Sequence, residues 1–537
     1  MEILYKIERF IGQVKFAVII ILIFTAYLIY GTFQESYHGA EYANRHVYKS
    51  IGFMLVQFLM FISIFNATLF RLPFRKNLSG FYVLHLGLLL LFIGSFVSYH
   101  AGIDSSILLS PNTPSQHILS QQEDELVFTS PKKQVTIPMP FSSSQKLIDQ
   151  TIGKVTIKEY LPFADEKLEW KEHDKIDVSN HSSSYLLMND MFTETITLSL
   201  FKASEFEAGA NLGPLSLHYL PSGFFECFKT NESEFILWNS LEQTCITSAS
   251  FEATKAPNGM DVIKTKYSGQ EDIFIPRLSP LPVFISKEKK LVIKQESPLR
   301  LLNRSTFKDK PHLFLFGENI AYFDRDSEKW VGKSFTKDNK FIELPWMGFK
   351  LELKNHFTNK YPILVPHYTV PIQDNNKLIA GATKALRIEI NDQGDIKSHW
   401  LKSFKPLKIK LSDGEYNFYF KSKSKKLPFQ LILDKFRAKK DPGTNRDASY
   451  ESFVTLVDGD TSKHHIFMNN PLVHKDLTFY QSTFQKNPQT GETLSGLTVN
   501  YDPGRWLKYL GSLLLVLGSF YHFVIRRKIV SLKGKTT

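Results

Sequence analysis

The sequence contains two cysteines, Cys227 and Cys245, among 537 residues. Two cysteines are too few for a disulfide framework, a cysteine-rich zinc site or an iron–sulfur cluster. They do not form a Cys-x-x-Cys pair, which excludes a thioredoxin-like redox role. The sequence also lacks a glycine-rich phosphate loop, a nucleophile elbow and a His-Glu-x-x-His motif. We therefore identify no catalytic residues and no self-contained active site.

Charged residues are missing from four long stretches, which are 16–34, 50–70, 77–103 and 509–525. A transmembrane helix needs about 20 apolar residues to cross roughly 30 Å of hydrocarbon, and the first three stretches reach that length. The fourth is slightly shorter, but Trp506 before it can lie at the membrane interface. The pattern predicts four transmembrane helices, three near the N-terminus and one near the C-terminus.

Basic residues are concentrated on one side of these helices. The two terminal segments and the loop between the second and third helices carry eleven Lys or Arg and two acidic residues. The loop 35–49 carries two of each. The positive-inside rule then places both termini in the cytoplasm and the large region outside, across a bacterial inner membrane. We therefore attribute most of the net charge of +12 to basic residues on the cytoplasmic side, where they contact anionic lipid. This charge gives no evidence for nucleic-acid binding.

The region from about 104 to 503 is expected to be mainly β. Apolar and polar residues alternate with a period of two, for example over 155–158 and 407–411, which is typical of strands with one buried face. We predict a sandwich-like β region with two packed halves that meet near 280–300. Cys227 and Cys245 would lie on the oxidising side, where a disulfide and two buried thiols are both compatible with the sequence.

The resulting prediction divides the chain into nine segments: a cytoplasmic tail 1–15, a first span 16–34, an external loop 35–50, a second span 51–70, a cytoplasmic loop 71–79, a third span 80–100, an extracytoplasmic β-rich domain 101–505, a fourth span 506–525 and a cytoplasmic tail 526–537.

His85 is the most informative single residue, because ionisable side chains inside a span are costly and usually face a partner, a cavity or a cofactor. Its imidazole could be an axial ligand of haem iron, could relay protons or could pack against another helix. His522 is expected at nearly the same depth in the fourth span, so two imidazoles could bracket one haem. An interfacial position is the alternative for His522.

Glycines at seven-residue spacing, Gly87 with Gly94 and Gly511 with Gly518, predict a helix–helix packing seam between the third and fourth spans. Such a seam would bring His85 and His522 toward each other. Seven other histidines show no metal-ligand spacing, and we expect them at surface or strand positions: His173, His181, His356, His367, His399, His464 and His465.

The order of these features resembles the ResB family, also called CcsB, of system II cytochrome c biogenesis proteins. In the membrane part the resemblance rests on 31–34, on His85-Leu86-Gly87 and on 94–98. In the external part it rests on a series of short motifs: 427–429, 433–436, Pro442-Gly443-Thr444, 451–453, 470–472, 479–482 and Asp502-Pro503-Gly504.

The resemblance implies a subunit of a membrane cytochrome c synthase. With a CcsA/ResC-type partner it would help to carry haem across the inner membrane and present apocytochrome c for covalent haem attachment in the periplasm. His85 matches the family's third-span histidine, an axial ligand of haem b bound transiently and non-covalently. In this role His85 would bind a metal only as the iron of haem. The partner would supply the second axial ligand of that iron. Other proteins of the pathway would reduce the cysteine thiols of apocytochrome c.

Two features set limits on that role. The partner's tryptophan-rich segment has no counterpart, because the six tryptophans are far apart in the sequence, so we expect the unfused form. This form would be a non-catalytic or co-catalytic subunit of the haem lyase. The alternative is a membrane-anchored extracytoplasmic chaperone or assembly scaffold with no haem role. A small-solute transporter fits poorly with four spans and so few charges within them.

Overall fold

The computed structural model describes most of the chain, and the described residues are 9–173, 180–230, 233–256, 259–274, 283–285, 291–293, 298–336, 340–375, 377–441, 443, 447–486 and 491–525. Four features used in the sequence argument lie wholly or partly outside them. These are the charged residues within 1–8, most of the expected boundary at 280–300, the ends of the motif Pro442-Gly443-Thr444 and the basic tail 526–537.

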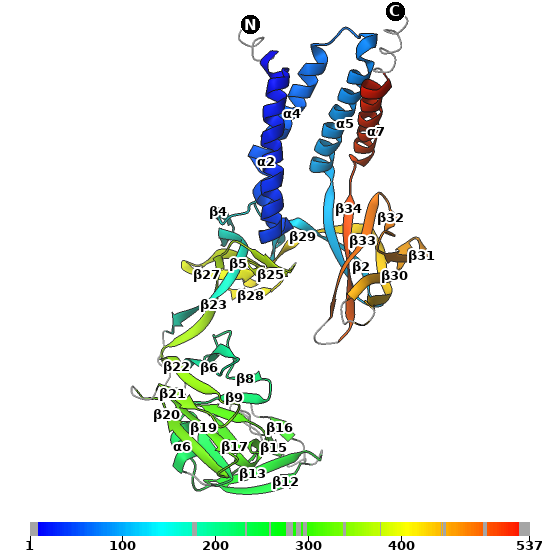
Figure 1. Ribbon diagram of the computed structural model, residues 1–537. Coiled ribbons are helices and arrows are strands. Elements are labelled where there is room, and N and C mark those ends of the chain that lie inside the picture. The colour runs from blue at the N-terminus through cyan, green and yellow to red at the C-terminus, as the bar shows by residue number, and fades with distance from the viewer. Residues whose placement is uncertain are drawn as a thin grey trace, which may run out of the picture. The chain divides into compact units, whose positions relative to one another are not determined.

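Four long apolar helices flank a large, mainly β region, as predicted (Figure 1). The helices are α2 (Val14–His38), α4 (Ile51–Leu69), α5 (Ser79–Ala101) and α7 (Arg505–Phe520), the last continued by the π-helix η4 (Tyr521–Ile525). All four are long and apolar enough to cross a membrane, so the chain is a multi-pass membrane protein.

The four helices form two pairs, α2 with α4 and α5 with α7 (Figure 1). In the first pair the rings of Phe24 and Phe53 stack at 5.5 Å, and Ser63 Oγ donates to the Ile11 carbonyl at 2.9 Å. The second pair is joined along a glycine seam described below. Short helical segments connect the long helices: α3 (Ala40–Ala43), the π-helix η1 (Asn44–Tyr48) and the 3₁₀ turn η2 (Lys76–Leu78).

The chain divides into two compact units. Unit 1 comprises residues 1–165 and 366–537, and unit 2 comprises 166–365. The prediction that two halves meet near 280–300 is therefore wrong. The chain passes from unit 1 into unit 2 within β5 (Val155–Glu172) and returns within β23 (Lys360–Tyr368). An inserted unit of this kind leaves no midpoint boundary, and the local strand pattern does not report which strands come together.

Unit 1 contains a ten-stranded sheet in which the main path is β31-β30-β29-β2-β1-β34-β33-β32, with β28 beside β29 and β3 beside β2. The strands are β1 (Ile103–Leu109), β2 (Pro114–Thr129), β3 (Gln134–Pro138), β28 (Leu407–Leu411), β29 (Gly414–Lys440), β30 (Asp447–Asp458), β31 (Asp460–Phe467), β32 (Leu472–His474), β33 (Leu477–Lys486) and β34 (Thr493–Tyr501).

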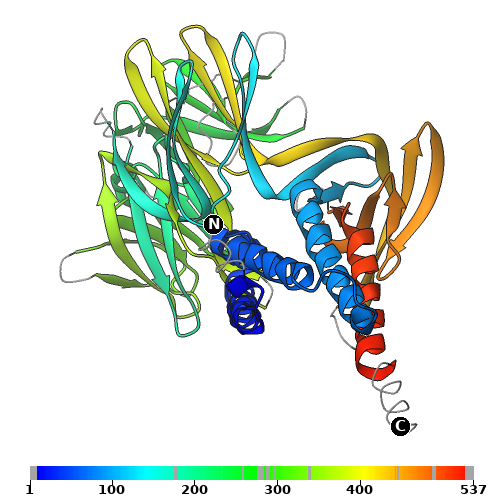
Figure 2. The same ribbon diagram turned by 90° about the horizontal axis from the view of Figure 1, so that it is seen from above.

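The long strand β29 runs between two lobes of unit 1 (Figure 2), and its two halves contribute to two separate hydrophobic cores. Its first half buries Phe418 and Phe420 in one core, and its second half buries Phe429 and Leu431 in the other. In each half these residues are two apart, as expected for a strand with one buried face. The paired strand β2 is divided between the cores in the same way, so β2 and β29 hold the two lobes of unit 1 together.

A five-stranded sheet follows the order β23-β5-β26-β27, with β4 beside β5, and a separate hairpin pairs β24 with β25. The strands not yet given are β4 (Lys146–Ile152), β24 (Ile372–Asp374), β25 (Lys377–Ala380), β26 (Thr383–Asp392) and β27 (Asp395–Lys402).

The described residues of unit 2 form four further sheets and the short helices α6 (Phe224–Thr230) and η3 (Arg304–Phe307). Their strands are β6 (Ser182–Met188), β7 (Thr193–Ser199), β8 (Gly209–Leu212), β9 (Leu215–Tyr219), β10 (Phe235–Asn239), β11 (Thr244–Cys245), β12 (Ser250–Lys255), β13 (Asp261–Tyr267), β14 (Gln270–Phe274), β15 (Val283–Ile285), β16 (Leu291–Ile293), β17 (Leu299–Asn303), β18 (His312–Leu315), β19 (Asn319–Asp324), β20 (Lys329–Ser334), β21 (Phe341–Glu343) and β22 (Lys350–Phe357).

Candidate functional site

His85 lies half-buried in the first half of α5 with one ring nitrogen engaged. Its Nδ1 is 3.0 Å from the carbonyl oxygen of Phe81, one helical turn earlier. A carbonyl can only accept a hydrogen bond, so Nδ1 carries the proton and Nε2 of the neutral imidazole keeps its lone pair. This is the arrangement in which an imidazole is oriented for metal binding, because the second nitrogen fixes the tautomer.

The ring of His85 belongs to a short stack at this end of the helix. The rings of Phe81 and His85 are 3.7 Å apart between centroids, and the guanidinium carbon of Arg71 lies 4.5 Å from the Phe81 ring centroid. Arg71 follows the end of α4, where its Nη1 donates to the Ala67 carbonyl at 2.7 Å. A cation is therefore held next to the imidazole by packing.

His85 lies on the side of α5 that is turned toward α4. Phe92 is seven residues further along, about two turns, so the two side chains share a helix face. The Phe92 ring is 6.4 Å from that of Phe61 on α4. The candidate ligand thus lies where α4 and α5 face each other, near the end at which Arg71 joins them.

The predicted glycine seam is present between α5 and α7. A Cβ added at Gly87 would lie 2.7 Å from the Gly511 carbonyl oxygen, and one added at Gly518 would lie 2.5 Å from the backbone nitrogen of Leu84. Gly94 also faces α7, where an added Cβ would lie 2.9 Å from the side chain of Lys508. These glycines let the two backbones approach closely, as the seven-residue spacing predicts.

His522 packs against Gly80 at the start of α5, where a Cβ would lie 2.9 Å from the His522 backbone nitrogen. His85 comes five residues later, which at about 100° per residue places it about 140° further round α5. The two imidazoles are nevertheless close enough to interact electrostatically, and a haem bracketed by both stays a prediction. The buried Nδ1 of His522 has no hydrogen-bond partner among the described residues.

At the other end of the α5–α7 pair, the motif Asp502-Pro503-Gly504 fixes the entry into α7. Asp502 accepts hydrogen bonds from Ser98 on α5 and from Lys508 Nζ, the latter at 2.7 Å. Burial raises the pKa of Asp502, but the hydrogen bonds from Lys508 and Ser98 outweigh it and hold the pKa below its usual value. This motif is one of those on which the family resemblance rests. In the structure it holds the start of α7 against α5.

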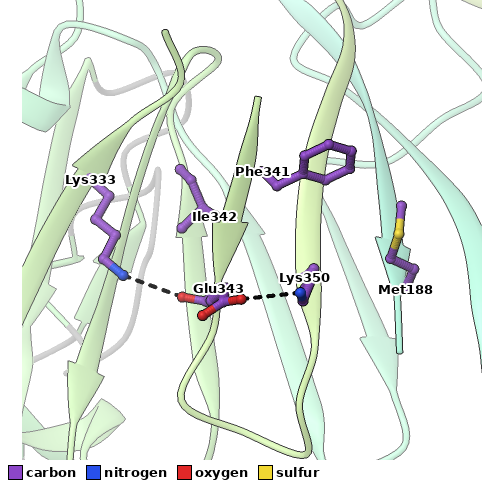
Figure 3. Close-up of a pocket in the computed structure, with 6 residues that line it drawn as sticks. All are labelled: Met188, Lys333, Phe341, Ile342, Glu343 and Lys350. Atoms are coloured by element: carbon purple, nitrogen blue, oxygen red, sulfur yellow. Dashed lines mark hydrogen bonds and ion pairs between the residues drawn. The ribbon is translucent and has the colours of Figure 1, made fainter. Parts of the chain in front are cut away.

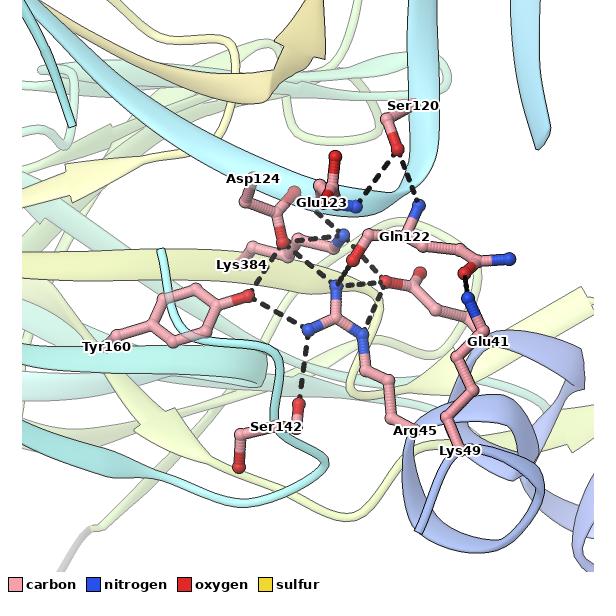
Figure 4. A network of polar contacts seen from close by, with 10 residues as sticks. All are labelled: Glu41, Arg45, Lys49, Ser120, Gln122, Glu123, Asp124, Ser142, Tyr160 and Lys384. Carbon is pink, nitrogen blue, oxygen red and sulfur yellow. Dashed lines mark hydrogen bonds and ion pairs between the residues drawn. The ribbon is translucent and has the colours of Figure 1, made fainter. Parts of the chain in front are cut away.

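A buried ionic network joins the loop between α2 and α4 to the β strands of unit 1 (Figure 4). The side chains of Arg45 and Asp124 are each 1% exposed, with Arg45 Nη2 3.0 Å from Asp124 Oδ2. Lys384 Nζ lies 3.0 Å from Asp124 Oδ1 and 2.7 Å from Glu41 Oε1. Tyr160 donates to Asp124 Oδ2 at 2.6 Å.

From the sequence alone, Arg45 is only one of the charged residues in the external loop 35–49. Burial alone would lower the pKa of Arg45, but Tyr160, Glu41 and Asp124 raise it, so the guanidinium stays charged. Two further hydrogen bonds, to the carbonyls of Ser142 and Gln122, complete its environment. The network has the character of a structural clamp, because its charges are paired with one another.

His181 is a core residue, so its predicted surface or strand position is wrong. Its Nε2 lies 3.1 Å from the Leu220 carbonyl and must donate, which leaves Nδ1 to accept from the Tyr219 hydroxyl at 2.5 Å. Ser183 then donates to Tyr219 at 2.6 Å and accepts from His356 at 2.9 Å. Among the described residues, no group of three or more His, Cys, Asp or Glu could hold a metal ion.

Unit 2 also contains the two cysteines and a shallow pocket. Cys227 and Cys245 are joined as a disulfide, which settles the alternative left open by the sequence. The pocket is lined by Met188, Lys333, Phe341, Ile342, Glu343 and Lys350 (Figure 3). Lys350 Nζ pairs with Glu343 Oε1 at 3.1 Å, and Lys333 donates to the Glu343 carbonyl at 3.3 Å. Both lysines are engaged with Glu343, and we assign no function to this pocket.

Comparison with known proteins gives two matches. Residues 410–494, which include β29 to β33, match the ResB-like family. The chain is also 37% identical over 101 residues to Protein NrfI of Wolinella succinogenes, across 18% of this chain and 11% of that protein. The chain therefore matches about a ninth of the relative's length. These matches agree with the predicted resemblance and show that residues 410–494 are similar to the ResB-like family.

Proposed function

We propose that this chain is the ResB-type subunit of a system II cytochrome c synthase. In this role it helps to carry haem across the cytoplasmic membrane and presents apocytochrome c for covalent haem attachment. The observation that carries the proposal is the oriented imidazole of His85, in a membrane protein whose residues 410–494 are ResB-like. The positive-inside pattern supports a cytoplasmic location for both termini and a periplasmic location for the β region.

The residues around His85 fit a transient haem b. When bound, haem would supply an iron that takes an imidazole nitrogen as an axial ligand. His85 offers Nε2 for this bond, because Nδ1 already donates to the Phe81 carbonyl. The apolar helix faces would shield the porphyrin ring from water, and Arg71, held over Phe81, would attract a propionate. The charge of Arg71 also contributes to the orientation of the helices.

The proposal assigns the remaining tasks to partners. His522 belongs to η4 and packs against Gly80 of α5, and the proposal takes the second axial ligand of the haem from a CcsA/ResC-type protein. Unit 1 and unit 2 would hold the apocytochrome near that partner. Both cysteines of this chain are joined in the Cys227–Cys245 disulfide, so reduction of the apocytochrome thiols would fall to other proteins of the pathway. The chain would then be a non-catalytic or co-catalytic subunit.

The test is the haem spectrum of the complex purified with its partner. We expect His85→Ala to lose most of the bound haem and to change the axial-ligand signature of any that remains. His100→Ala is the matched control, since His100 is an exposed residue at the other end of the same helix. Equal haem content and ligation in the two variants would remove His85 from the mechanism. A preparation that is colourless and without a partner would favour the chaperone or scaffold alternative.

A further inference from the structure

The hairpin β24–β25 has one face on α2 and an apolar face without a partner among the described residues. Its strands pair only with each other in the described part of the chain. A Cβ at Gly39, just past the end of α2, would lie 3.0 Å from Gln373 Oε1 and 3.6 Å from Leu378 Cδ2. Gln373 and Leu378 are register partners, so this face of the hairpin rests on the end of α2.

The opposite face carries Ile372 and Ile379, with exposed fractions of 47% and 67%. Ile372 of β24 pairs with Ala380 of β25. The register shifts beside that pair, so Ile379, the residue before Ala380, lies at a β-bulge in β25. A two-stranded hairpin is only marginally stable in water on its own, and exposed isoleucines on it favour another apolar contact.

The base of the hairpin is firmly attached to unit 1. Nδ1 of His38, the last residue of α2, lies 2.6 Å from the Pro371 carbonyl and donates to it. The Gly381 backbone nitrogen donates to Asp165 Oδ1 at 2.7 Å. Gly381 has φ +66°, and a Cβ there would lie 2.7 Å from Pro371 Cα, so glycine is needed for this close approach. The hairpin is therefore held at a fixed height on α2.

That height corresponds to the membrane–water interface. The charge-free part of α2 ends at Gln34, and Gly39 comes five residues later, about 7 Å along the helix. The interfacial layer on each side of a bilayer is also about 5–7 Å thick. Phe33 and Tyr37 are exposed and stack at 6.5 Å on the same end of α2, as expected for an aromatic belt.

We propose that the Ile372–Ile379 face of this hairpin lies in the lipid headgroup and acyl boundary and anchors unit 1 to the bilayer. The occupant is the same membrane that α2 spans, because the hairpin is attached to the end of that helix. The polar tip, with Asp374 and Lys377, stays at the headgroups. The proposal is independent of haem and of the role of His85.

The test uses the full-length protein in lipid nanodiscs with a fluorescent label at single introduced cysteines. Cys227 and Cys245 are joined, so the unsubstituted protein gives the labelling blank under non-reducing conditions. Ile379→Cys probes the hairpin, and Ile372→Cys gives a second probe of the same face. Met347→Cys is the matched control, because Met347 has the same exposed fraction of 67% but belongs to unit 2.

We expect dibrominated phosphatidylcholine to quench the two hairpin labels several-fold more than the Met347 label, and aqueous iodide to do the reverse. Labels at 372 and 379 that respond to iodide as strongly as the control, without lipid quenching, would overturn the proposal. Labels shielded from both quenchers would overturn it as well, since another protein surface would then cover the face.

Discussion

Gly87 of α5 and Gly511 of α7 face each other reciprocally: a Cβ on either residue would lie 2.7 Å from the carbonyl oxygen of the other. Real Cβ atoms are essentially never found so close to backbone atoms, so a side chain at either position must push the helices apart. The close packing of α7 on α5 therefore requires glycine at both positions. This packing also sets the position of His522, which contacts Gly80 of α5.

We expect Gly87→Ala to weaken the α5–α7 pair by about 1–3 kcal/mol, because overpacking at a closed helix contact costs that much. The measurement is the unfolding midpoint of the purified protein in mild detergent. Leu86→Ala is the control, since Leu86 is exposed on the same helix and should change the midpoint little. A Gly87→Ala protein as stable as the Leu86→Ala protein would mean that the seam is not tightly closed.

The ionic network predicts a large difference between a buried and an exposed charge. Asp124→Asn removes the carboxylate that faces Arg45 and leaves the guanidinium without its buried counterion, which typically costs about 3–5 kcal/mol. Asp149→Asn removes an exposed partner of Lys158, and we expect it to change the stability little, because water and salt screen exposed ion pairs.

Chemical unfolding of both variants checks this prediction. Similar losses in the two proteins would contradict it. We also expect limited proteolysis to cut the loop 39–50 faster in Asp124→Asn, because Arg45 holds that loop on the β strands.

The chain of hydrogen bonds at His181 predicts a pH dependence of unit 2. Burial lowers the pKa of His181 to about 3, with a further contribution from His356. The unfolded chain titrates near pH 6.5, so below that pH the unfolded state takes up the proton first. Stability should fall as the pH drops from about 6.5 toward 3, by at most ~1.4 kcal/mol per pH unit.

Hydrogen–deuterium exchange in β6 and β9, corrected for intrinsic rates, measures this locally. We expect protection to decrease between pH 7 and pH 5 in the natural protein and to change less in His181→Gln. Equal pH profiles in the two proteins would show that His181 is not the titrating group.

The sequence was sufficient for features that depend on neighbouring residues. Charge-free stretches indicated the four helices, and seven-residue glycine spacing indicated the seam at Gly87 and Gly511. The ionic network could not be foreseen, because Arg45, Asp124 and Lys384 are far apart in the chain and each looks like an ordinary surface charge. The faces of His85 and His522 also needed the structure, since depth follows from position along a helix but direction follows from how the helices pack.

The disulfide between Cys227 and Cys245 supports a periplasmic location of unit 2, because disulfides persist in oxidising compartments such as the periplasm. We expect protein trapped in acid directly from cells to contain no thiol that reacts with a maleimide until it is reduced. Met347→Cys is the positive control for labelling, since its side chain is exposed in the same unit. Replacing both natural cysteines with alanine should lower the stability of unit 2 by about 3 kcal/mol, the entropy of an 18-residue loop. Two freely reactive natural thiols would contradict the periplasmic location, because they would indicate a reducing environment around unit 2.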